Sequence, residues 1–148
     1  HYQGKADILL TVLDLVAALD AEIYRQAKEA ATPLAALESV FRQNVALMQR
    51  YRALPILFLS DLMWIEEPRL GERLRQDCRR CRAEEIALLR QGQALGQIRN
   101  DLAAEELANS FLAAYVMLGL MNSRRIDEVD VARQADVNWR LFEKAVRP

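Results

Sequence analysis

The chain has 148 residues, of which 52% are hydrophobic and 28% charged, and its formal net charge is −1. This composition is typical of one globular domain and excludes a disordered chain, and the near-zero charge argues against nucleic-acid binding through bulk electrostatics. Only 5 glycines and 4 prolines occur, so turn signals for a β-rich protein are scarce and an all-α fold is predicted.

Membrane and secreted proteins are excluded next. The longest uninterrupted apolar run covers residues 111–121, too few to span a bilayer, and no secretory signal is visible. We therefore expect a cytoplasmic protein without membrane contact. The two cysteines cannot form a disulfide framework, which agrees with that location. Because the first residue is His1 rather than methionine, we expect the native protein to have a further N-terminal portion.

Apolar side chains that recur every three or four residues predict six helices. Thr32 and Pro33 provide an N-cap and a first-turn proline for the second helix, and Pro68 begins the fourth. Gly92 and Gly96 mark the end of that fourth helix. The predicted helices cover residues 5–29, 33–52, 55–67, 68–93, 103–124 and 127–146.

The fifth predicted helix is apolar on every side, and such a helix must be buried on every side. The sixth carries its own apolar stripe, and a short link joins the two. Two helices of this kind predict a four-helix bundle made by two chains, whereas the alternative is a monomer whose core they cap. The predicted dimer-interface residues are Leu107, Phe111, Ala114, Leu118, Met121, Ala135, Trp139 and Phe142.

Cys78-x-x-Cys81 is the first candidate for site chemistry. A zinc site needs four ligands, but the chain has no further cysteine and a single histidine, and the pair lies in the middle of a helix. We therefore expect two buried structural cysteines on the inner row of that helix. The arginine-rich run over residues 69–82 is predicted to be a solvated face, with binding of phosphate or an acidic partner as the alternative.

Catalysis has no support in the sequence. No glycine-rich phosphate loop, G-x-S-x-G or H-E-x-x-H motif occurs, and adjacent glutamates such as Glu66 and Glu67 point in different helical directions. We expect no enzymatic activity, no cofactor and no bound metal.

A ligand pocket is the remaining candidate site. The second to fifth predicted helices carry large, adaptable apolar side chains with a few isolated polar groups among them, which is how small-molecule sites are usually built. A solid core is the alternative for each residue. The predicted ligand-binding residues are Phe41, Asn44, Met48, Phe58, Asp61, Leu62, Trp64, Glu85 and Tyr115.

Two segments carry motifs of a known family. His1, Tyr2, Lys5 and Ile8 match the end of the pattern Y-x-H-[FY]-x-x-K-x-x-[LI]. Residues 96–108 match G-x-[IL]-R-x-D-[LI]-x-x-x-x-[LA]-A, with Ala104 where many members have proline. Both motifs occur in TetR/AcrR-type transcriptional regulators, and the chain resembles this family over essentially its whole length.

The resemblance implies a six-helix regulatory domain whose last two helices form a four-helix-bundle dimer interface. Residues 1–4 would be the remnant of a DNA-recognition helix and its turn, and residues 5–148 a ligand-binding and dimerisation domain. The implied partners are a second copy of the chain, operator DNA bound through the missing N-terminal unit, and a small hydrophobic or aromatic effector that releases a repressor from DNA. His1, Tyr2 and Lys5 would lie near the DNA backbone only in the full-length protein.

The resemblance also implies a mechanism, in which a bound ligand tilts the first helix and changes the spacing of two recognition helices. Two other functions are compatible with the residues: a non-enzymatic helical module that binds a different protein, and a carrier of hydrophobic metabolites.

Overall fold

The computed structural model describes residues 4–126 and 128–148, and in these residues all regular structure is helical, as predicted. Among the described helices, none combines the length and hydrophobicity that crossing a lipid bilayer requires. The elements in chain order are α1 (Lys5–Ala27), α2 (Pro33–Arg50), α3 (Leu54–Phe58), the π-helical turn η1 (Leu62–Glu66), α4 (Pro68–Ala94), α5 (Ala104–Arg124) and α6 (Val131–Val146).

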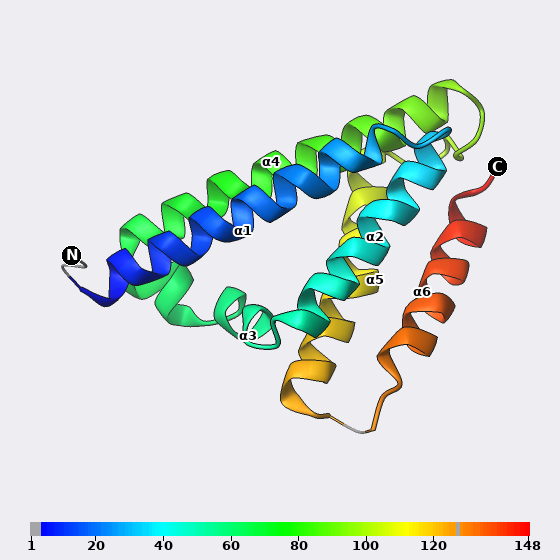
Figure 1. Cartoon of the computed structure of the whole chain (residues 1–148). Coiled ribbons are helices and arrows are strands. Elements are labelled where there is room, and N and C mark those ends of the chain that lie inside the picture. The colour runs from blue at the N-terminus through cyan, green and yellow to red at the C-terminus, as the bar shows by residue number, and fades with distance from the viewer. Residues whose placement is uncertain (1–3, 127) are drawn as a thin grey trace.

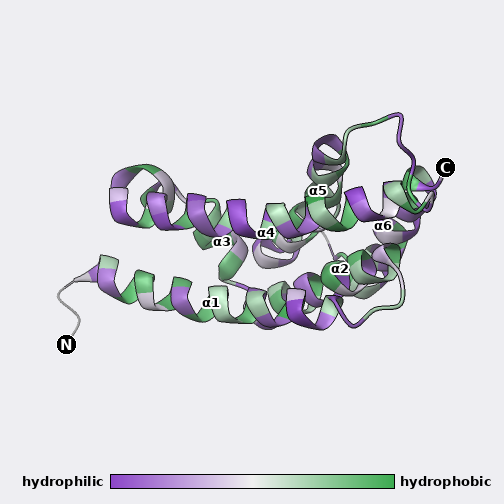
Figure 2. Ribbon diagram, turned by 90° about the horizontal axis from the view of Figure 1, so that it is seen from above, coloured by the Kyte–Doolittle hydropathy of each residue, from purple (hydrophilic) through white to green (hydrophobic). Residues whose placement is uncertain are grey.

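Two long helices set the shape of the molecule. α1 and α4 lie side by side along its length, and α2, α5 and α6 cross them toward one end (Figure 1). α3 and η1 connect the far end of α2 to the start of α4. Viewed from above, α4 is mostly hydrophilic (Figure 2), so its packing against α1 cannot be a simple apolar seam.

Side-chain caps determine where the helices begin. The Thr32 hydroxyl accepts a hydrogen bond from the Ala35 amide at 3.1 Å, which confirms the predicted start of α2. Asp130 caps α6 in the same way through the Arg133 amide, so this helix begins at Val131 and not at residue 127. Asp127 lies outside the described residues.

The prediction of one helix over residues 55–67 is wrong, because the chain forms two separate elements there, α3 and η1. The Ser60 hydroxyl donates to the Leu57 carbonyl at 2.9 Å, and the Trp64 indole N–H donates to the Phe58 carbonyl. Side chains thus bond two carbonyls that a continuous helix would use, and the helix ends there.

The core consists of two clusters. The main one lies mostly between α2, α5 and α6, and its rings have centroids 5.3 to 6.3 Å apart. A smaller cluster lies between the first halves of α1 and α4 and η1. The rings of the main cluster are Phe41, Phe111, Tyr115, Trp139 and Phe142, and the buried members of the smaller one are Leu9, Leu13, Met63, Leu70 and Leu74.

Gly71 allows η1 to approach α4 closely. A Cβ atom at this position would lie 2.7 Å from the Trp64 carbonyl oxygen, which is backbone and cannot move aside by a rotamer change. Glycine is therefore required where the π-helical turn meets the first turns of α4.

Leu37→Ala should destabilise the fold strongly, because Leu37 is fully buried in the main cluster and its loss leaves a cavity. We expect the free energy of unfolding to fall by about 2–5 kcal/mol, measured by urea denaturation at fixed protein concentration. The matched control is Leu15→Ala on the exposed face of α1, where we expect a change within about 0.5 kcal/mol. Equal losses in the two variants would contradict this description of the core.

Candidate functional site

The residues predicted to line one ligand pocket lie in different places. Phe41 is fully buried against the rings of Phe111, Tyr115 and Trp139, which leaves no room for a ligand there. Met48 packs in the same main cluster, where its sulfur lies over Gly119 of α5. These side chains form solid core.

The other predicted pocket residues are also separated. Phe58, Leu62 and Trp64 pack against the smaller cluster at the other end of the molecule, and Asp61 is exposed. Asn44 donates its amide to the Val40 carbonyl of its own helix at 2.9 Å. Among the predicted pocket residues, the Trp64 indole bonds the Phe58 carbonyl, and a hydrogen bond between side chains joins Glu85 and Tyr115.

Glu85 is a carboxylic acid in the interior, with only 3% of its surface exposed. Its Oε1 accepts hydrogen bonds from the hydroxyl groups of Tyr24 at 3.1 Å and Tyr115 at 3.3 Å. Burial raises the pKa of Glu85 to about 7, and the two phenol hydrogen bonds only partly oppose this shift. One buried acid thus joins α1, α4 and α5.

A second acid lies nearby on α1 and is partly buried. Asp20 accepts a weak hydrogen bond from the Cys81 thiol, with a sulfur–oxygen distance of 3.7 Å. Burial is the main reason why the pKa of Asp20 rises to about 6. Burial also raises the pKa of Cys81, so this thiol is a poor nucleophile at neutral pH.

The inner row of α4 differs from the prediction. Cys78 is exposed and Cys81 only partly buried, whereas Asp77 and Glu85 are buried. Asp77 is stabilised there by Arg80 and by Arg73, whose Nε lies 3.0 Å from it. In the part of the chain that the structure describes, no three His, Cys, Asp or Glu side chains are arranged to hold a metal ion.

A cavity of about 200 Å³ lies between α1 and α4 beside these groups. The methyl groups of Ala17 and Ala21 are too small to fill the space between the two helices, and Tyr24 connects the cavity wall to Glu85. The lining residues are Ala17, Asp20, Ala21, Tyr24, Arg25, Lys28, Arg80, Cys81 and Glu84.

Asp20 and Tyr24 are the site residues that sequence reasoning missed. They lie four residues apart, and Ala27 follows three residues after Tyr24, so all three share a helix face. This spacing is the signal that could have identified them. It was hidden because an aspartate at an inner position has the same appearance in a sequence as one at the surface.

The residues predicted to approach DNA lie at the start of α1. Lys5 is exposed and lines a depression of about 450 Å³, which also includes the ion pair of Asp7 and Arg69. His1 and Tyr2 lie outside the described residues.

Most of the predicted dimer-interface residues are buried within the single chain. Six of the eight lie in the core of a single chain, so they have almost no surface with which to contact a second chain. Helical spacing identified the apolar stripe, but the chain's own core covers it. The buried six are Leu107, Phe111, Leu118, Ala135, Trp139 and Phe142, while Ala114 and Met121 are partly exposed.

The outward surface of α5 and α6 contains other apolar side chains. Ala113 and Met117 are four residues apart and exposed on α5, and Leu141 of α6 is 64% exposed. Asn138 donates to the Ala114 carbonyl across the two helices at 2.7 Å, so Leu141, three residues later, lies on the side of α6 that faces α5. We call Ala113, Met117 and Leu141 the outer apolar face.

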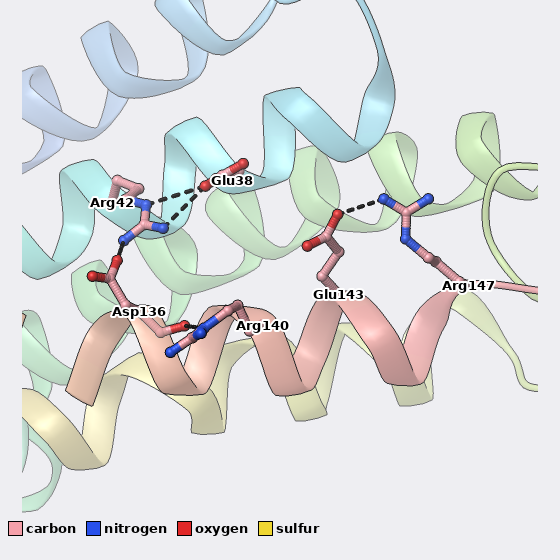
Figure 3. Close-up of polar contacts among 6 residues, drawn as sticks. All are labelled: Glu38, Arg42, Asp136, Arg140, Glu143 and Arg147. Atoms are coloured by element: carbon pink, nitrogen blue, oxygen red, sulfur yellow. Dashed lines mark hydrogen bonds and ion pairs between the residues drawn. The ribbon is translucent and has the colours of Figure 1, made fainter. Parts of the chain in front are cut away.

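The opposite flank of α6 is polar. Arg42 of α2 lies between Glu38 and Asp136, and its ion pair with Asp136 joins α2 to α6 (Figure 3). One turn further along α6, Arg140 donates to the Asp136 carbonyl. The flank toward α2 is therefore occupied by contacts within the chain, whereas Leu141, the α6 member of the outer apolar face, is exposed.

Comparison with known proteins identifies a fold. No protein-family model matches the chain, and no curated protein matches it. A solved structure, the crystal structure of the MbdR regulator from Azoarcus sp. CIB, matches with a TM-score of 0.80 at 20% identity, over 99% of this chain and 80% of that chain. The chain thus shares the all-helical fold of that structure.

Glu85→Gln should change how stability depends on pH. Gln keeps the shape and an acceptor for the tyrosines but cannot bind the proton. The pKa of Glu85 is raised from 4.5 to about 7 in the folded chain, so the wild type should lose stability as the pH rises through this interval. We expect the variant to be close to the wild type near about pH 5 and more stable by roughly 1–3 kcal/mol near about pH 8.

Urea denaturation across this pH range measures the effect, with Glu84→Gln at the cavity rim as the control. Parallel pH profiles for the wild type and Glu85→Gln would show that Glu85 does not hold a raised pKa.

Proposed function

We propose that this chain is the effector-binding and dimerisation domain of a TetR-type transcriptional regulator, a repressor that a small hydrophobic or aromatic ligand releases from DNA. The observation that carries the proposal is the cavity between α1 and α4 beside the buried Glu85, in a fold similar to that of a solved regulator. The domain acts by binding and has no catalytic role. A unit that precedes α1 in the full-length protein binds operator DNA.

Surface ion pairs between α1 and α4 support movement of α1. Pairs with this much exposure contribute about 0–1 kcal/mol each, so they hold the two helices together without locking them. The pairs are Asp7–Arg69, Asp14–Arg73 and, from the residue just after α1, Lys28–Glu84, with N–O distances of 3.0, 2.6 and 3.4 Å.

A ligand in the cavity would act through α1. The recognition helices of a dimer fit successive major grooves about 34–36 Å apart, so a small tilt of α1 in each subunit would spoil the fit. The ligand shifts this equilibrium only by its difference in affinity for the two states. A ligand that fits the cavity only when α1 has tilted provides that difference.

The proposed dimer forms through the outer apolar face. Met117 and Leu141 are large apolar side chains with 57% and 64% exposure in the single chain. Ala113, Ala114 and Met121 adjoin them and are small or flexible enough for two helices to approach. Two such faces related by a two-fold axis would give the four-helix bundle of α5 and α6 from each subunit.

Met117→Glu should convert the dimer to a monomer, because it buries an unpaired carboxylate at the proposed interface. In sedimentation equilibrium we expect the wild type to behave as twice the chain mass of 16.9 kDa and the variant as a single chain. Leu15→Glu, on the exposed face of α1, is the control and should remain dimeric. A wild type that stays monomeric would overturn the dimer.

Ala17→Leu should abolish ligand binding, because it fills the cavity from its α1 wall. The probes are three single-ring compounds, benzylamine, benzyl alcohol and benzoate, added separately to ¹⁵N-labelled protein. We expect at least one probe to shift amide resonances of α1 and α4 in the wild type and none to do so in the variant. Ala18→Leu, one residue away on the exposed side of α1, should bind like the wild type.

Failure of all three probes in the wild type would contradict a ligand site at this cavity. Binding that survives Ala17→Leu would mean that the probes occupy some other surface.

A further inference from the structure

The cavity between α1 and α4 contains a carboxylate that no cation pairs with among the described residues. Asp20 lines the cavity, and its recorded hydrogen-bond partner is the Cys81 thiol, a weak donor at 3.7 Å. Burial raises the pKa of Asp20 to about 6, which reflects the cost of keeping this charge away from water. A bound cation would offset that cost.

The cations of the cavity rim already have partners. Each forms an ion pair with a carboxylate other than Asp20, so the rim is not an empty anion site although three basic side chains contribute to it. The pairs are Arg25 with Glu22 and Glu29, Lys28 with Glu84, and Arg80 with Asp77. These ion pairs do not include Asp20, and the nearby positive charge of Arg80 opposes its negative charge only in part.

The remaining walls limit the size and shape of the ligand. Ala17 and Ala21 contribute methyl groups, and Tyr24 contributes an aromatic side chain whose hydroxyl is already bonded to Glu85. The volume of about 200 Å³ lies below the roughly 300–1,000 Å³ of sites for drug-sized molecules. One ring or a short alkyl chain fits this space.

We propose that this cavity binds a small monocation, a protonated amine on a single aromatic ring or short alkyl body, whose ammonium group pairs with Asp20. The inference rests on the proposed effector site and adds the chemical class of the ligand. The ammonium group donates to the Asp20 oxygens, the alanine methyl groups contact the apolar body, and the Tyr24 ring favours a neighbouring positive charge.

Near-isosteric probes test the charge preference. Benzylamine, benzyl alcohol and benzoate share one ring and differ at the charged end, and each is titrated into the wild-type chain by calorimetry. We expect benzylamine to bind at least tenfold more tightly than the other two. Equal affinity for all three, or a preference for benzoate, would overturn the inference while leaving the proposed ligand site intact.

Asp20→Asn tests the residue. It keeps the side-chain shape and removes the charge, and we expect at least a tenfold loss of benzylamine affinity with no change for benzyl alcohol. Asp136→Asn is the matched control, since Asp136 lies on α6 in an exposed ion pair with Arg42 and should leave both affinities unchanged. Unchanged benzylamine binding by Asp20→Asn would overturn the inference.

A third test needs no variant and measures how the affinity of the wild-type chain for these probes depends on pH. The titratable and charged groups that interact with Asp20 from other helices are Asp77, Cys78, Arg80, Cys81 and Glu85 of α4 and Tyr115 of α5. Between about pH 5 and about pH 7 benzylamine stays protonated while Asp20 loses its proton, so benzylamine affinity should rise and benzyl alcohol affinity should stay level. Level affinity for benzylamine would overturn the inference, and loss of binding by every probe would overturn the ligand site with it.

Discussion

The packing of the molecule depends on the burial of one carboxylic acid against two phenols. Glu85 receives hydrogen bonds from Tyr24 and Tyr115, so a polar group in the middle of α4 fixes the positions of α1 and α5. An apolar residue at position 85 would allow α1 and α4 to pack through apolar side chains without water between them. The acid instead needs donors at a set distance, and one of these donors, Tyr24, also lines the cavity together with Ala17 and Ala21.

The two halves of the molecule are held by different forces. The crossing helices α2, α5 and α6 share a cluster of aromatic rings with many mutual contacts, which makes them a rigid body. The N-terminal half of α1 rests on a small aliphatic cluster and on surface ion pairs. We therefore expect α1 to move relative to this body. The cavity lies where the two halves of the molecule meet.

The sequence predicts helix existence and most boundaries well, because caps and prolines act locally. Thr32 and Pro33 form the expected start of α2, and α5 was predicted to within one residue. Longer-range features could not be predicted. Spacing alone does not tell whether a stripe such as that of Phe111 is covered by the same chain or by another. Nor does spacing show that Asp77 faces inward and Cys78, about 100° further around the helix, faces outward, because the pattern does not fix the exact direction of the buried face.

The π-helical turn and Gly71 have a joint consequence for how this chain can diverge. A π-helical turn holds one residue more than an α-helical turn, and its carbonyl at Trp64 occupies the space that a side chain at position 71 would need. A lineage that replaces this glycine must therefore relocate the turn, and deletion of one residue between 62 and 66 is the simplest way to do so. We therefore expect replacement of Gly71 and deletion of one residue between 62 and 66 to occur together in descendants of this sequence.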